Sequence, residues 1–373
     1  MSSANSPSNQ QPFKKNDALQ ILRAVAALLV VHRHCVEVVR LHQEKPPANS
    51  YALDKFGACG VDIFFVISGF ILATVVLRTD PQTPRLAFDF LTRRVLRIFP
   101  IYWIVSIFFL VLAATHNLLT PEAALNSYLL LPSGYPLKAP LLIFGWTLMF
   151  EMFFYYLITI NLFFGQRAAI LRTITFILLL TGIGAIAGFQ RPILILIANP
   201  MNVEFVLGCL IALVYARFGK WPRLGTTFLV IGCLALATTV WLGFGRIDDA
   251  AFALNGSQSW ARVLRWGIPA AAVTAGVVFR RGDIRSAVAR CFARLGDASY
   301  SIYLTSMVTL FLVNRFYRPL AGLPPALNVF LLISLVVLAG VSTFAGIERP
   351  MTGLLSGRYE TARRRGMLLL LNR

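Results

Sequence analysis

The chain has 373 residues, of which 57% are hydrophobic and only 14% are charged, whereas soluble domains typically carry ~25% charged residues. With so few charges to cover a water-facing surface, this composition excludes an ordinary soluble enzyme, a disordered chain and a disulfide-bonded secreted scaffold. The net charge of +19 does not indicate a nucleic-acid-binding protein, because the basic residues lie in short clusters between long apolar runs. The sequence therefore predicts a multi-spanning membrane protein.

Ten segments of the chain approach the length of about 20 largely apolar residues that a membrane-spanning helix needs. They predict an all-α fold, a polytopic membrane helix bundle of about ten transmembrane helices at 19–41, 57–77, 98–119, 141–164, 170–189, 192–215, 225–244, 260–279, 298–320 and 326–346. Residues 1–16 are expected to form a disordered cytoplasmic N-terminus, residues 17–346 the transmembrane domain, and residues 347–373 a basic cytoplasmic tail.

The orientation of the bundle follows from the Lys and Arg residues in its short connections. If the N-terminus is cytoplasmic, roughly three times as many Lys and Arg residues fall on the cytoplasmic side as on the opposite side. This asymmetry predicts that both termini are cytoplasmic and that much of the positive charge contacts anionic lipids.

The first predicted span contains ionisable side chains, which are costly inside a membrane and so require an explanation. Arg23 and His34 are eleven residues apart, about three helical turns, and therefore share one face ~16 Å apart. That face is predicted to line a polar path across part of the membrane.

The second predicted span places Asp62 at about the same depth as His34. A carboxylate next to a histidine fixes the imidazole tautomer and stabilises the imidazolium, which is an arrangement typical of a general base. An interhelical hydrogen bond with only a structural role is the alternative for Asp62.

A cluster of three arginines, Arg93, Arg94 and Arg97, precedes the third span at the cytoplasmic interface. An interfacial helix whose arginines contact lipid headgroups is one interpretation. A clamp for a polyanionic cytosolic cofactor is the other, because guanidinium groups match phosphate geometry.

The fourth span adds Glu151 near mid-membrane. The cysteines lack metal-ligand spacing, so no metal site is predicted.

Taken together, these motifs resemble the membrane-bound acyltransferase family 3, and within it the bacterial exopolysaccharide O-acetyltransferases. The resemblance covers nearly the whole chain and depends on seven motifs in order. They are LQILRAVAALLVVHRH with Arg23 and His34, GVDIFFVISGF, RRVLRIFPIYW with Arg94 and Arg97, WTLMFEMFFY with Glu151, EFVLG, SYSIYL and Glu348-Arg349-Pro350.

The resemblance implies a multi-pass enzyme of the cell inner membrane that moves an acyl group, usually acetyl from acetyl-CoA as co-substrate, onto a hydroxyl of an exported glycan or a lipid-linked oligosaccharide. Polysaccharide-synthesis machinery is a candidate partner besides membrane lipids. In this hypothesis the arginine cluster holds the CoA phosphates and Arg23 stabilises negative charge. His34, oriented by Asp62, either deprotonates the hydroxyl or carries the acyl group, and Glu151 is a second acid/base or structural candidate.

Two other classes of function remain open at this point. A transporter or flippase for a glycan intermediate would also need many spans with buried charges. A structural partner of a polysaccharide synthase would use the same polar residues only to hold helices together.

Overall fold

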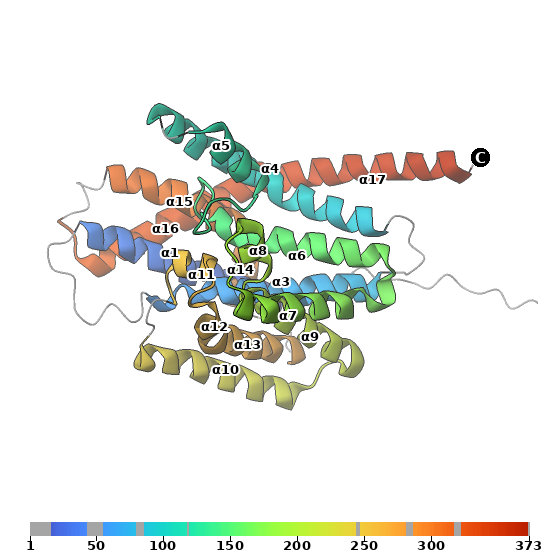
Figure 1. The fold of residues 1–373 in the computed structure, drawn as a ribbon. Helices are drawn as coiled ribbons and strands as arrows, with labels where there is room; N and C mark the ends of the chain where they lie inside the picture. Colours follow the sequence, from blue (N-terminus) through green and yellow to red (C-terminus); the bar gives the residue numbers. More distant parts are fainter. Residues whose placement is uncertain are drawn as a thin grey trace, which may run out of the picture.

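The computed structural model describes residues 16–42, 55–79, 86–117, 119–243, 247–280, 286–316 and 322–371, with side chains up to residue 363. Throughout these ranges the regular elements are helices, and no strand occurs. The all-α prediction is therefore confirmed (Figure 1). The predicted disorder of the N-terminus falls on residues that lie almost entirely outside the described ranges.

Each of the ten predicted spans coincides with a helix or with two helices in succession. These are α1 (Asp17–Leu41), α3 (Cys59–Arg78), α4 (Leu86–Thr115), α6 (Gly145–Phe163), α7 (Ala169–Ala187), α8 (Pro192–Ile197) with α9 (Asn202–Phe218), α10 (Pro222–Leu242), α12 (Ser259–Arg262) with α13 (Ile268–Phe279), α15 (Ser299–Arg315) and α16 (Pro325–Thr343). Four further helices are α5 (Pro121–Leu129), α11 (Ala250–Leu254), α14 (Ala287–Asp297) and α17 (Arg349–Leu371).

Eight helical segments in the described part of the chain are long and apolar enough to cross a membrane. The two predicted spans that fall short of this measure are α1 and α15. Helix α1 carries five charged residues, and α15 has only 17 residues and several hydroxyl side chains. Both helices lie against other spans of the bundle, and the buried polar side chains of α15 include Ser299, Ser301, Thr305 and Ser306. The protein is a polytopic membrane bundle, and the cytoplasmic position of its termini stays a prediction.

The burial of the spans separates central helices from peripheral ones. In α3 and in the α12–α13 segment 72% of the apolar window is buried, against 22% in α10 and 17% in the α16–α17 segment. Exposed apolar side chains on the peripheral helices include Ile186 on α7, Trp241 on α10 and Leu338 on α16. Outward-facing apolar surface of this extent is expected of helices that contact lipid.

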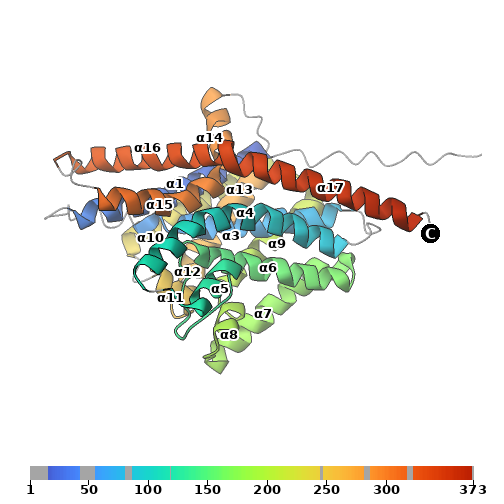
Figure 2. The same cartoon turned by 90° about the horizontal axis from the view of Figure 1, so that it is seen from above.

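Helix α3 runs through the centre of the bundle, packed between α1 and α9 (Figures 1 and 2). Glycines allow this close approach, as is usual between membrane helices. A Cβ atom on Gly69 would lie 2.2 Å from the carbonyl oxygen of Phe205, and one on Gly60 would lie 2.3 Å from that of Ala26. The residues that α3 carries between these glycines are therefore held in fixed positions relative to α1.

The C-terminal segment is helical, which the sequence did not predict. Helix α16 continues through a π-helical turn (Phe344–Glu348) into α17, and α17 lies beside the first half of α4 (Figure 1). Helix α4 has 30 residues, or ~45 Å, which exceeds the ~30 Å of a hydrocarbon core. The arginine-bearing start of α4 is therefore expected to extend out of the membrane, with α17 alongside it.

Candidate active site

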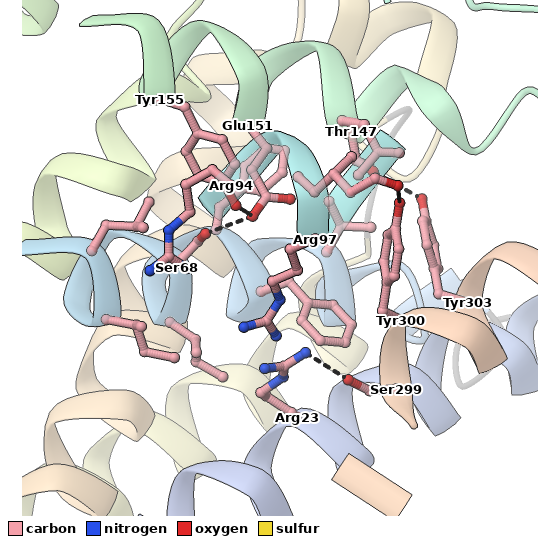
Figure 3. A pocket seen from close by; sticks show the side chains of 18 residues that line it. Arg23, Ser68, Arg94, Arg97, Thr147, Glu151, Tyr155, Ser299, Tyr300 and Tyr303 are labelled. Atoms are coloured by element: carbon pink, nitrogen blue, oxygen red, sulfur yellow. Dashed lines mark hydrogen bonds between the residues drawn. The ribbon is translucent and has the colours of Figure 1, made fainter. Parts of the chain in front are cut away.

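A narrow cavity of about 100 Å³, here called the arginine cavity, lies between α1, α3, α4, α6 and α15. Four of the predicted site residues line it: Arg23, Arg94, Arg97 and Glu151. Figure 3 shows the guanidinium groups of Arg23 and Arg97 turned towards each other across this space. The structure thus brings together residues as far apart in the sequence as Arg23 and Glu151, which are separated by 128 positions.

Two hydroxyl groups hold the carboxylate of Glu151 in the arginine cavity. Ser68 Oγ donates a hydrogen bond of 2.9 Å to Glu151 Oε1, and the Tyr155 hydroxyl donates a short one to the same oxygen (Figure 3). Tyr155 lies four residues after Glu151 on α6, so the two side chains share a helix face. The sequence analysis did not assign Tyr155 to the site, although this spacing could have identified it.

The three arginines of the cavity lack a matching number of acids. Arg23 Nη2 donates to Ser299 Oγ at 3.0 Å, and the Arg94 guanidinium lies 5.7 Å from the centre of the Phe90 ring. Among the described residues none of the three forms an ion pair within 4.0 Å. Partly buried cations without counter-ions are costly, so the cavity is suited to an anionic ligand.

The structure does not place Arg93 with the other two arginines of its cluster. Arg93 Nη2 lies 2.6 Å from Glu360 Oε1 on α17, and its side chain is 48% exposed. Arg93 is absent from the lining of the arginine cavity. The structure therefore separates Arg93 from Arg94 and Arg97, and its role in cofactor binding stays a prediction.

Asp62 does not meet His34, which corrects the predicted pair. Its carboxylate is completely buried and accepts from Arg262 Nε at 3.0 Å and from Arg262 Nη2 at 2.8 Å. The same guanidinium donates to the carbonyl oxygens of Ala58 and Ile247. A bidentate arginine binds a carboxylate more strongly than a neutral imidazole does, so Asp62 serves as the counter-ion of Arg262.

His34 takes a different acidic partner, one turn along its own helix. His34 Nδ1 lies 3.2 Å from Glu37 Oε2, and the imidazole ring lies 4.7 Å from the ring of Phe144. With Nδ1–H donating to the carboxylate, Nε2 is left as the acceptor nitrogen. The sequence analysis sought the partner of His34 in another span and missed the three-residue spacing to Glu37.

His34 lines a second and much larger cavity of about 840 Å³, here called the histidine cavity. Its polar lining includes Arg33, whose Nη1 lies 2.9 Å from Asp248 Oδ2, and its aromatic lining includes Trp146 and Phe252. Polar groups interleaved with aromatic rings make this space suitable for a polar organic ligand.

Val61, Phe144 and Tyr303 separate the two cavities and are here called the partition. Val61 and Tyr303 line both cavities. The Tyr303 hydroxyl donates to the Phe144 carbonyl oxygen at 3.1 Å and lies 3.2 Å from Thr147 Oγ1. The Phe144 ring stacks on the Tyr303 ring at 5.1 Å and also contacts His34. The partition therefore connects the histidine to the wall of the arginine cavity.

The chain gives no group of three or more His, Cys, Asp or Glu residues suited to a metal ion within the described ranges. The two cavities provide a group of arginines, a histidine with an acidic partner, and two side chains, Val61 and Tyr303, that line both spaces. This arrangement can bind a charged donor on one side and activate a hydroxyl on the other.

Comparison with known proteins agrees with this chemistry. The sequence profile of the acyltransferase 3 family, described as an acyltransferase domain, matches residues 16–346. The chain is 28% identical over 318 residues to the exopolysaccharide production protein ExoZ of Rhizobium meliloti, covering 82% of this chain and 93% of that protein. It is 35% identical over 97 residues to protein 2 in the picA locus of Rhizobium radiobacter, covering 25% of this chain and 44% of that protein. No solved structure matches. The chain belongs to the acyltransferase 3 family of multi-pass membrane proteins.

Proposed function

We propose that this protein is an O-acyltransferase of the bacterial inner membrane that moves an acetyl group from acetyl-CoA to a hydroxyl of an exported polysaccharide or its lipid-linked precursor. The observation that carries the proposal is the pair of cavities that meet at one partition. One cavity has three arginines that form no ion pair with the described residues, and the other has a histidine with an acidic partner. The family membership favours acyl transfer over the transporter and scaffold alternatives.

The arginine cavity is proposed as the donor site. Arg94 and Arg97 are assigned to the CoA phosphates, because guanidinium groups bind phosphate through paired hydrogen bonds. They lie on the half of α4 that the charge asymmetry of the loops predicts to be on the cytoplasmic side, where CoA thioesters are made.

The histidine cavity is proposed as the acceptor site. Its larger volume and its mixture of charged and aromatic side chains suit a sugar, which presents both hydroxyl groups and apolar faces. The relative from Rhizobium meliloti carries exopolysaccharide production in its name, which supports a polysaccharide acceptor. Polysaccharide-synthesis machinery is the partner that would deliver this acceptor.

The reaction assigned to the partition is direct transfer with His34 as general base. Nε2 of His34 accepts the proton of the sugar hydroxyl while the hydroxyl oxygen attacks the thioester carbonyl carbon. A carbon–oxygen bond forms, the carbon–sulfur bond breaks, and CoA leaves as the thiolate, which takes up a proton. Glu37 stabilises the imidazolium. Arg23 offsets negative charge on the donor side, and Glu151 is the second acid/base group.

Transfer through an acyl-histidine is the alternative use of the same nitrogen. The two routes differ when acceptor is withheld. Incubation of the protein with labelled acetyl-CoA, followed by rapid denaturation, leaves label on His34 only if the acyl-histidine forms. Direct transfer leaves the label on CoA.

The function is tested by acetyl incorporation into glycan with the full-length protein in membranes. His34→Ala is expected to lower the rate by about 10²- to 10⁴-fold, the usual contribution of a general base. His32→Ala is the matched control, because residue 32 lies two positions away on a different helix face and does not line the histidine cavity. Wild-type membranes that leave all label on CoA, or a His34→Ala variant as active as His32→Ala, would contradict the proposal.

A further inference from the structure

Val61 and Tyr303 occupy a position that the mechanism above leaves without a role. Among the described residues they are the two that line both the arginine cavity and the histidine cavity. Both are buried, with exposed fractions of 6% and 7%. Val61 and Tyr303 are therefore the side chains that border both the proposed donor site and the cavity of His34.

The packing of α3 fixes Val61. The preceding residue, Gly60, lies so close to α1 that a Cβ atom there would be 2.9 Å from Val30 Cγ2. The following residue, Asp62, is held by the bidentate ion pair with Arg262. Val61 is therefore flanked on both sides by contacts that leave the backbone of α3 little freedom to move away from a bulky group.

Tyr303 is fixed from the opposite side of the passage. Its hydroxyl donates to the carbonyl oxygen of Phe144 and lies within hydrogen-bond distance of Thr147. Its ring stacks on the ring of Phe144 with an interplanar angle of 18°. A tyrosine held both at its hydroxyl and along its face keeps one rotamer, so the passage has a defined width.

We propose that Val61 and Tyr303 form the aperture through which the acyl group passes, and that these two side chains set the largest acyl group the enzyme transfers. The inference rests on the proposed function. Within a rigid apolar passage, one methylene group more or less changes a specificity ratio by about 10- to 200-fold. On this proposal the aperture makes the enzyme selective for short acyl groups.

The test compares acetyl-, propionyl- and butyryl-CoA as donors for the full-length protein in membranes, with the substitutions Val61→Ala and Val61→Ile. Val61→Ala is expected to raise the butyryl-to-acetyl ratio of kcat/KM by about 10-fold or more, and Val61→Ile to lower the propionyl-to-acetyl ratio by a similar factor. Both substitutions change one or two carbon atoms, so the fold is expected to survive at least one of them.

Val66→Ala is the matched control for the Val61 series. Val66 also lies on α3 and is completely buried, but it is in the lining of neither the arginine cavity nor the histidine cavity. The donor ratios are expected to stay near those of the wild type in Val66→Ala. If Val66→Ala shifts the ratios as far as the Val61 series does, a general loosening of α3 sets the size limit and the aperture is wrongly assigned.

Tyr303→Phe provides an independent test from the other side of the aperture. This substitution keeps the ring and removes the hydroxyl that anchors it. It should therefore raise the butyryl-to-acetyl ratio of kcat/KM by about five-fold, the equivalent of one neutral hydrogen bond.

Wild-type protein that transfers no acyl group would overturn the proposed function and the aperture with it. Wild-type transfer with donor ratios that no substitution at Val61 or Tyr303 changes would leave the function standing and refute the aperture alone.

Discussion

The single arginine Arg262 and the three arginines of the arginine cavity differ in how completely their charge is neutralised. Arg262 is 1% exposed, and its guanidinium donates two hydrogen bonds to Asp62 and two to backbone carbonyls. It also lies 5.0 Å from the centre of the Trp266 ring. Arg23, Arg94 and Arg97 instead share one cavity and form no ion pair with any residue in the described part of the chain.

The contrast separates a structural charge from a ligand-binding one. A buried ion pair whose hydrogen bonds are all formed within the protein has no donor or acceptor left for a ligand. Removal of one partner leaves the other as an uncompensated charge. Cations that converge on a cavity with fewer acids than arginines are the reverse case, because an anionic ligand supplies the missing charge. From the sequence both groups look alike, as ionisable residues in apolar segments.

The largest effect is expected where the ion pair is broken. Arg262→Met should lower the free energy of unfolding by about 3–5 kcal/mol, because the buried Asp62 then loses its counter-ion. The change is measured as loss of thermal stability of the purified protein in detergent. The double variant Asp62→Leu with Arg262→Met should recover most of that loss. A well-folded Arg262→Met protein without activity would instead return Asp62 to the catalytic role that the sequence suggested.

Substitution in the arginine cavity is expected to weaken donor binding and to leave the stability of the protein unchanged. Arg94→Gln should raise KM for acetyl-CoA by about 10- to 100-fold, or about 1.5–3 kcal/mol, the range for a hydrogen bond to a charged group. Thermal stability should not fall, because no ion pair is lost. Arg93→Gln, one residue away and outside the cavity, is the control and should change KM less than five-fold. Equal effects of the two substitutions would mean that surface charge, not the cavity, attracts the donor.

Most of the fold could be predicted from the sequence, because hydropathy alone identifies apolar segments of membrane-spanning length. The start of the third span differs most: α4 begins at Leu86, whereas the predicted span begins at residue 98. The preceding turns are helical but carry arginines, so a criterion based on apolar length omits them. Helix α17 was missed for the same reason, since its polar sequence has no apolar stripe long enough to predict a span.

The candidate site could be predicted only in part. Arg23, Arg94, Arg97 and Glu151 meet in one cavity, although the sequence analysis placed the arginine cluster at the cytoplasmic interface and Glu151 near mid-membrane. The partner of Asp62 could not be found in this way, since Arg262 is 200 residues away and depth in the membrane does not determine which helices are neighbours. Glu37 could have been found, because three-residue spacing on one helix is local.

The contact between His34 and Glu37 is expected to have an intermediate effect. Glu37→Ala should lower kcat for transfer to glycan by roughly ten-fold, or about 1.4 kcal/mol, because the exposed carboxylate contributes one hydrogen bond to the imidazolium. KM for acetyl-CoA should not change, since Glu37 is in the histidine cavity and not in the arginine cavity. The measurement is steady-state kinetics with a glycan acceptor. A change in KM for acetyl-CoA with constant kcat would place the histidine cavity on the donor side instead.

The smallest effect is expected at a third group of charges, where α17 lies beside α4. Asp89 accepts from the Tyr359 hydroxyl and from Arg363 Nε at 2.8 Å, and Arg93 pairs with Glu360. These contacts hold the α4 segment that bears Arg94 and Arg97. Because Arg93 and Glu360 are partly exposed, their pairing is worth only about 0.2–1 kcal/mol.

A charge exchange tests whether this third group positions the arginine cavity. Arg93→Glu and Glu360→Arg each place like charges together, so each should raise KM for acetyl-CoA by up to about five-fold, whereas the double variant should return KM towards the wild-type value. Glycan KM is the internal control and should stay constant, because α17 does not line the histidine cavity. If KM for acetyl-CoA is as high in the double variant as in the single ones, α17 and α4 are held by apolar packing. The paired charges at this surface then contribute nothing to donor binding.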